Sequence, residues 1–489
     1  MTVDTMRSGT LQVGWTRFAR LAGLLPWRSL RVLLTREFSV AEASFVLMAG
    51  FLLAALLGAV RQVLFHAQFG AGSEASAFYA ALRLPDVLFN LLAGGTLSSA
   101  LIPVLLRTAR REGQAAAARL TAQVLTSLWI GVALLVLLLE VCAPFFVRVV
   151  LAPGFAESTS RLTIILTRLM LVQPLLLVLG AVATAVLNSR NQFLLTALAL
   201  LSHNMGLLGG IVLTQWWPGL GIYGAALGVI GGALGQTIIL LPGLAALRRR
   251  PWPVWNPLDC HLREVARLLI PNGLSATVNY ACLVMGTAFA SLVQEPVALV
   301  ADYNAWLLVE VSIALLGQTV AQAVFPRLAA HGDASDWQGL RRTLLRALGV
   351  VNGGSILVVM ALVVWGRPLI ALLFERGEFD AAVGELTYRL LVIYALCLPA
   401  YVSTELITGG WLALRDARTP LLINLVQFGM RLTLLTMSIG RLGVMAIPLA
   451  FTTTITMETL LLGSLLLRWI RQKERGTPKT QSVPVSLRG

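Results

Sequence analysis

Long apolar stretches dominate this sequence, and the short polar joints between them alternate between arginine-rich and arginine-poor. The chain is 57% hydrophobic and only 12% charged, whereas soluble domains average roughly 25% charged residues. In proteins that thread a bilayer, the joints on the inner side carry an excess of Lys and Arg. The alternation therefore predicts a chain that crosses a membrane many times.

A spanning helix needs about 20 mostly apolar residues, and twelve stretches meet this requirement. Because lipid offers the backbone no hydrogen-bond partners, each stretch should be an α-helix. The expected spans are residues 41–66, 78–106, 119–142, 160–186, 193–214, 220–247, 264–292, 297–326, 343–365, 384–411, 419–439 and 443–467.

The arginine pattern also predicts the orientation of these spans. With the N-terminus inside, 28 of the 38 cations fall on the inner side, six on the outer side, and the other four within helices. We therefore expect a multi-pass protein of the inner (plasma) membrane, with cytoplasmic N- and C-termini. The same pattern explains the net charge of +15 without a nucleic-acid partner.

The sequence resembles itself at an offset of about 224 residues. Pro144 precedes Gly154 after the third span, and Pro368 precedes Gly377 after the ninth. These matches predict an all-α protein of two six-helix repeats around a central V-shaped cavity, an arrangement in which transporters bind substrate between the halves. The expected parts are a basic cytoplasmic segment (1–40), a first half (41–247), a cytoplasmic linker (248–263), a second half (264–470) and a disordered cytoplasmic tail (471–489).

Motifs for enzymatic chemistry are absent from the sequence. There is no phosphate-binding glycine loop, zinc-protease motif or kinase signature, and the four histidines and four cysteines are scattered. We therefore expect neither an enzyme nor a bound cofactor or metal. The basic, aromatic-containing segment 1–40 fits either a helix lying on the inner leaflet or a disordered tail.

Polar residues inside the spans are the candidates for function, because a charge at the bilayer centre costs roughly 2.5–3.5 kcal/mol on insertion scales. The first two and the seventh and eighth spans open the two halves, so we expect their polar groups to converge on one cavity. Two cations there would bind an anionic group such as a pyrophosphate. The candidates are Arg61, Arg83, Asp86, Asn90 and Asn279 for substrate binding, and Asp302 and Glu310 for coupling to a cation or to the membrane potential.

Each of these candidates has a structural alternative. Arg61 could extend to the outer surface of the bilayer, and Arg83 and Asp86 could form a structural ion pair. Glu310 could make an interhelical hydrogen bond instead of lining a cavity. These alternatives are open at the level of sequence.

Several ordered segments between about residue 45 and residue 470 resemble the MurJ/MviN flippases of the MOP exporter superfamily. The segments that carry the resemblance are LLGAVRQVLFHAQFGAG (56–72), FYAALRLPDVLFNLLAGGTLSSALIPVL (78–105), RLMLVQPLLL (168–177), LNSRNQF (187–193), AQAVFPRLA (321–329), LLFERGEFD (372–380) and LRDARTP (414–420). Arg61 matches the helix-1 cavity arginine of that family. Leu307, in contrast, stands where the family usually has a helix-8 arginine, and many members have two further helices.

This resemblance implies a flippase that moves lipid II, an undecaprenyl-pyrophosphate-linked peptidoglycan precursor, from the inner to the outer leaflet by alternating access. The implied partners are that lipid-linked oligosaccharide and the surrounding membrane lipids. Two alternatives are an exporter of another glycolipid or a drug, and a non-transporting membrane scaffold in envelope assembly. Neither the substrate nor the oligomeric state follows from the sequence.

Overall fold

The structure, a computed structural model, describes residues 40–476 apart from 93–95, 243, 245–253, 257–258, 294, 296 and 417. All regular secondary structure within these residues is helical. The predicted basic segment before Val40, and the predicted tail after Gly476, lie outside the described residues.

The helices follow one another along the chain with short joints, and every expected span overlaps at least one of them. They are α3 (Val40–Phe69), α4 (Ser73–Leu92), α5 (Thr96–Glu112), α6 (Gln114–Phe145), η1 (Phe146–Leu151), α7 (Glu157–Met170), α8 (Val172–Ser189), α9 (Leu194–Trp216), η2 (Pro218–Leu220), α10 (Ile222–Leu240), α11 (Cys260–Leu292), α12 (Val297–Ile313), η4 (Ala314–Gln318), α13 (Thr319–Asp333), α14 (Trp337–Phe374), α15 (Ala381–Ala395), α16 (Leu398–Ala413), α17 (Arg418–Leu442), η5 (Gly443–Met445) and α18 (Ala446–Gly476).

Many of these helices can cross a bilayer. Among the described residues, eight stretches are long and apolar enough, or nine if the pair α15–α16, bent by 45°, is counted as one span. Large apolar side chains also cover the exterior: Leu134 and Leu357 are each 64% exposed and Met437 is 73% exposed. An apolar exterior of this extent fits contact with lipid. The all-helical membrane fold is therefore confirmed, whereas the number twelve stays a prediction.

Two helix ends differ from the expected boundaries. α11 begins at Cys260, inside the predicted linker, because the Asp259 side chain accepts hydrogen bonds from the backbone N–H groups of His261 and Leu262 and so caps the helix. α18 continues to Gly476, inside the predicted tail. There Arg341 of α14 forms a 3.2 Å ion pair with Glu474.

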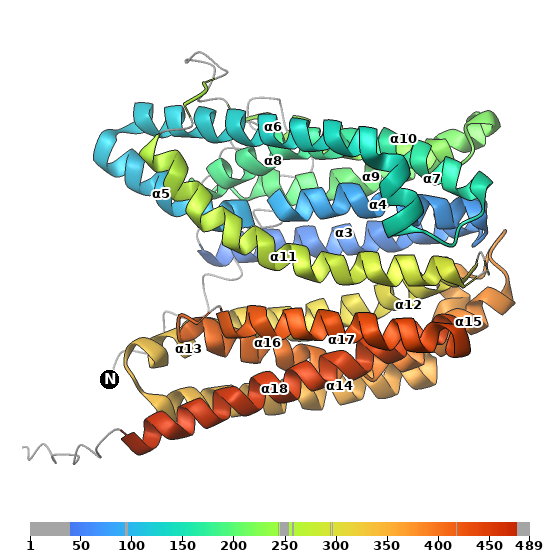
Figure 1. Cartoon of the computed structure of the whole chain (residues 1–489). Helices are drawn as coiled ribbons and strands as arrows, with labels where there is room; N and C mark the ends of the chain where they lie inside the picture. Colours follow the sequence, from blue (N-terminus) through green and yellow to red (C-terminus); the bar gives the residue numbers. More distant parts are fainter. Residues whose placement is uncertain are drawn as a thin grey trace, which may run out of the picture.

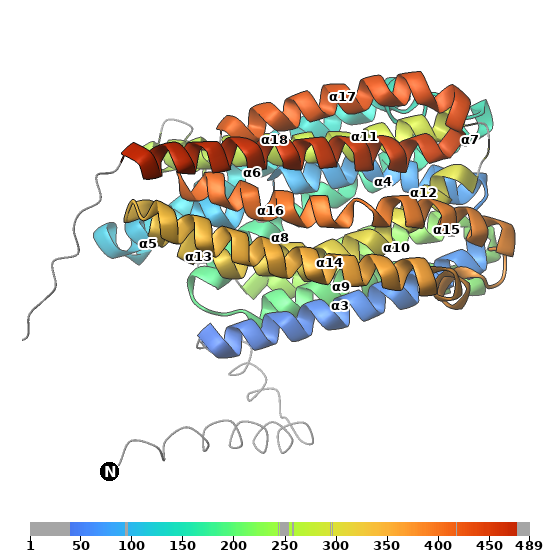
Figure 2. The ribbon, with the colours of Figure 1, turned by 90° about the horizontal axis from the view of Figure 1, so that it is seen from below.

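The helices form two groups of roughly parallel rods, with α3 to α11 in one group and α12 to α18 in the other (Figure 1). α11 packs mainly against α4 and α5, although it also touches α17, α12 and α18. The boundary between the two groups therefore comes after α11 in the chain, and not at the linker before α11. At the side of the molecule, α3 lies along α9 and reaches α14 of the second group (Figure 2).

Prolines in helices and left-handed glycines recur along the chain at nearly constant spacing. Pro103 and Pro326, Pro144 and Pro368, and Pro174 and Pro399 lie within helices 223, 224 and 225 residues apart. Gly221 and Gly443 have φ values of 48° and 56°, a left-handed conformation that glycine adopts without strain. The repeated positions of these prolines and glycines fit the offset found in the sequence.

The predicted orientation can be tested with two serine-to-cysteine variants in a background without native cysteines. Ser73, at the α3–α4 turn, is expected outside, and Ser335, at the α13–α14 turn, is expected inside; both are exposed. We expect a membrane-impermeant maleimide added to intact cells to label Ser73→Cys but not Ser335→Cys, because the arginine-rich joints should be cytoplasmic. The reverse pattern would contradict the orientation.

Candidate functional site between the helix groups

A buried polar network joins the two groups near the predicted outer end. The Gln62 amide donates to Asn304 Oδ1 at 2.9 Å and to the Tyr79 hydroxyl at 2.8 Å. His66 Nε2 lies 2.9 Å from the same Asn304 oxygen. All these side chains are buried, and separating them would leave polar groups unsatisfied, at roughly 1–3 kcal/mol each.

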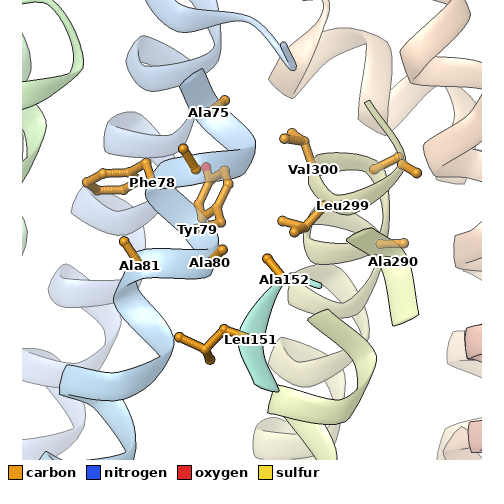
Figure 3. Packing of buried hydrophobic residues seen from close by; sticks show 14 of the residues in the cluster. Ala75, Phe78, Tyr79, Ala80, Ala81, Leu151, Ala152, Ala290, Leu299 and Val300 are labelled. Atoms are coloured by element: carbon orange, nitrogen blue, oxygen red, sulfur yellow. The ribbon is translucent and has the colours of Figure 1, made fainter. Parts of the chain in front are cut away.

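An apolar layer surrounds this network. Tyr79 of α4 faces Leu299 and Val300 of α12, and the neighbouring α4 positions are mostly alanine (Figure 3). The ring of Tyr79 stacks on Tyr303 with centroids 4.0 Å apart. Small side chains on α4 allow the two helices to approach closely, so this end of the interface is packed shut.

A glycine turn joins the two groups at the same end. Gly377, in the α14–α15 joint, has φ of 60°, and a Cβ there would collide with the Ala67 carbonyl oxygen of α3. The next residue, Glu378, donates its N–H to that oxygen at 3.3 Å, while the rings of Phe374 and Phe379 pack against His66. The segment LLFERGEFD, noted in the sequence, thus docks on the end of α3.

A second glycine turn holds the end of α11 within the first group. The Gly154 N–H donates to the Ser291 hydroxyl at 3.2 Å, and a Cβ at Gly154 would collide with the Ser291 carbonyl oxygen. A pocket of about 360 Å³ beside this contact is lined by residues of α4, α7, α11 and α12. Both turns therefore depend on glycine for close backbone approach.

Arg61 does not extend freely to the outer surface of the bilayer. It is half-buried, and its guanidinium donates to Asn204 of α9 at 3.2 Å and to Gln62 at 3.4 Å. Its Nε is buried without a partner among the described residues. Arg61 thus lies between a helix of its own group and the polar network.

Arg83 lies at the boundary, between α11 of its own group and α12 of the second group. Its Nε donates to Thr287 of α11 at 2.9 Å, and its guanidinium carbon lies 5.4 Å from the ring centroid of Tyr303. Asp86, one turn further along α4, is close enough to Arg83, Arg61 and Glu310 for their charges to interact. The structure thus brings these four predicted residues from three helices together.

The two acidic residues of α12 differ in environment. Asp302 is buried and accepts a 2.9 Å hydrogen bond from the Tyr394 hydroxyl of α15. Glu310 is exposed and interacts electrostatically with Arg83 across the boundary between the groups. Asn90 and Asn279 lie on α4 and α11, but their side chains are outside the described residues.

Sequence reasoning missed two features of this region. Gln62, His66 and Asn304 were not assigned, although their place among apolar residues is a detectable signal. Arg431 of α17 was one of the four intrahelical cations but received no role. In the structure it lines a cavity of about 30 Å³ together with Arg83 and Asp302.

Two helical groups that meet at one end, with intramembrane charges between them, define a polytopic membrane transporter fold. Among solved structures, the chain resembles the lipid II flippase MurJ in an inward closed conformation, with a TM-score of 0.73 and 19% identity over 88% of this chain and 90% of that one. It also resembles an inward-facing MATE family multidrug resistance transporter of the MOP superfamily, with a TM-score of 0.71 and 13% identity over 92% and 98% of the two chains.

The family model described as lipid II flippase MurJ matches residues 65–485, and the chain belongs to this family. It is 29% identical over 387 residues to the lipid II flippase MurJ of Burkholderia cenocepacia, covering 76% of this chain and 73% of that protein. It is 26% identical over 390 residues to the probable lipid II flippase MurJ of Rhizobium meliloti, covering 78% and 71%. The resemblance found in the sequence is confirmed, and a family of flippases agrees with the prediction of a transporter rather than an enzyme.

The role of the Gly377 turn can be tested through Cys282, a half-buried native cysteine that lines the 30 Å³ cavity. With Cys282 as the sole cysteine, we expect Gly377→Ala to raise its maleimide labelling from the α3–α4 side by about 5- to 30-fold. The left-handed conformation costs a residue with a Cβ roughly 1–2 kcal/mol, and the collision with Ala67 adds to this cost.

Gly72, in the neighbouring turn, is the matched control because a Cβ there meets nothing within 4 Å. Gly72→Ala should label at the wild-type rate. Equal labelling of Gly377→Ala and wild type would show that this turn does not hold the interface closed.

Proposed function

We propose that this chain moves a lipid-linked, pyrophosphate-bearing glycan of the lipid II type from the inner to the outer leaflet, by alternating access, for peptidoglycan synthesis. The observation that carries the proposal is the gathering of Arg61, Arg83, Asp86 and Glu310 where the two groups meet, in a member of a lipid II flippase family. Guanidinium groups in a low-dielectric interior bind phosphate oxygens strongly and with defined geometry.

Alternating access fits the uneven interface between the groups. The α3–α4 end is closed by a hydrogen-bond network, stacked rings and the Gly377 turn, all of which can separate without a change inside either group. A head group bound near Arg61 and Arg83 would be released when this end opens. In transporters with repeated halves, such rocking leaves the binding site near the middle of the membrane.

Glu310 and Asp302 are proposed to couple transport to a cation or to the membrane potential. Glu310 is exposed beside Arg83, so a bound cation or proton there would change the charge that the head group meets. Asp302 is held by Tyr394 and would respond only if α12 and α15 move relative to one another. Moving one charge through 100 mV is worth about 2.3 kcal/mol, enough to bias such a step.

The function is tested by complementation in cells depleted of their own lipid II flippase. We expect the wild type to restore growth and Arg61→Ala to abolish it at equal membrane abundance. Loss of a charge-assisted hydrogen bond to phosphate should weaken binding by about 10- to 150-fold.

Asn204→Ala is the control, because it removes the structural partner of Arg61 but keeps its charge, and it should still support growth. If Arg61→Ala restores growth, Arg61 does not make the contact with the head group that we assign to it. Failure of the wild type to restore growth would favour another exported lipid or drug, or a scaffold without transport activity.

A further inference from the structure

Arg431 is the most deeply buried arginine among the described residues, with only 4% of its surface exposed. It lies near the middle of α17. Its Nε donates to Thr454 of α18 at 3.1 Å, and its guanidinium carbon sits 4.2 Å from the ring centroid of Phe451. These two contacts fix the plane of the guanidinium group before any ligand arrives.

Within the part of the chain that the structure describes, the remaining donors of this guanidinium have no acceptor. Among the described residues, Arg431 forms no ion pair and makes no hydrogen bond besides the one to Thr454. The indole N–H of Trp306, on the same cavity wall, is also buried without a partner. A buried donor without a partner, such as the Trp306 N–H, is unusual in proteins, and its position beside the guanidinium of Arg431 favours a ligand rich in acceptor oxygens.

The charge of the cavity favours an anion. Arg83 and Arg431 contribute two positive charges to its lining, and Asp302 contributes one negative charge, whose oxygen is occupied by the Tyr394 hydroxyl. Glu458 of α18 is within electrostatic range of Arg431 but forms no ion pair with it among the described residues. The side chains that line the cavity thus carry a net charge of +1, while Asp86 and Glu310 lie outside the lining, within electrostatic range of Arg83.

Both helix groups build this cavity. Arg83 and Cys282 belong to the first group, whereas Trp306 and Arg431 belong to the second. Its volume of about 30 Å³ holds only one or two water-sized groups. Separation of the groups would enlarge it, so its size depends on the conformation of the transporter.

We propose that Arg431, Trp306 and Arg83 form a binding site for a phosphate-type oxyanion that bridges the two groups. In the proposed function this anion is the pyrophosphate of the lipid-linked substrate. The identity of the lipid rests on that function, but the anion site itself does not. Arg431 and Trp306 supply unused donors from one group, and Arg83 supplies a cation from the other.

The test measures binding of sodium pyrophosphate to the full-length protein in lipid nanodiscs, from its thermal stabilisation at constant ionic strength. We expect Arg431→Gln to weaken apparent affinity at least about tenfold, because a charge-assisted contact is lost. Trp306→Phe keeps the ring, removes only the N–H donor and should also weaken binding. Arg168→Gln is the control: Arg168 is another intrahelical arginine, bound to the Glu140 carbonyl, and its loss should leave affinity unchanged.

Wild-type affinity in both Arg431→Gln and Trp306→Phe would overturn the proposal, as would absence of pyrophosphate binding by a folded wild type. Trp306→Phe keeps the test decisive if Arg431→Gln fails to fold. Undecaprenyl pyrophosphate in the nanodisc should compete with the free anion if the site takes the lipid head group; binding without competition would assign it to a soluble phosphate. Failure of the wild type in complementation would remove the proposed function while leaving this binding measurable.

Discussion

The absence of water from the bilayer interior governs this structure more than any other constraint. Every backbone group must be satisfied within its own helix, and every intramembrane polar side chain needs a partner. The polar side chains of α3, α4 and α12 find many of those partners across the boundary between the groups. The contacts that satisfy Gln62, His66 and Asn304 are therefore the same contacts that hold the α3–α4 end closed.

This closed end combines specificity with reversibility. Stacked and apolar contacts alone would allow the two groups to slide along each other. The Asn304 oxygen, in contrast, accepts the hydrogen bond from Gln62 and lies beside His66 in only one relative position of the helices. The network is also incomplete, because the Asn304 amide nitrogen is buried without a partner among the described residues. A closed state with an unsatisfied donor is less stable than full pairing would make it, which suits an interface that must open in each transport cycle.

Much of this architecture was predictable because lipid simplifies the relation between sequence and structure. Apolar length marked the helices, and the three-residue spacing of Arg83 and Asp86 predicted that they share one face of α4. Packing across the boundary was not predictable. The sequence offset assigned α11 to the second half by chain order, yet α11 packs on α4 and α5, because side-chain fit rather than chain order decides which helices touch. Arg431 escaped assignment for a related reason: its isolation on α17 gives no spacing pattern with Trp306 of α12, and only the fold brings them together.

The distribution of cations between the groups bears on how a flippase of this family can lack a helix-8 arginine. The resemblance noted in the sequence puts Leu307 at that place on α12, and the neighbouring Trp306 and the guanidinium of Arg431 line a cavity opposite Arg83. An anion is stabilised by the electrostatic potential at its own position. That potential depends on the position of the guanidinium group and not on the helix that carries it. A cation supplied from α17 can therefore replace one supplied from α12, provided that it is fixed in orientation, as Arg431 is by Thr454 and Phe451. The physical requirement on such a chain is positive charge from both groups at the boundary, and this requirement is compatible with considerable divergence in the residues that meet it.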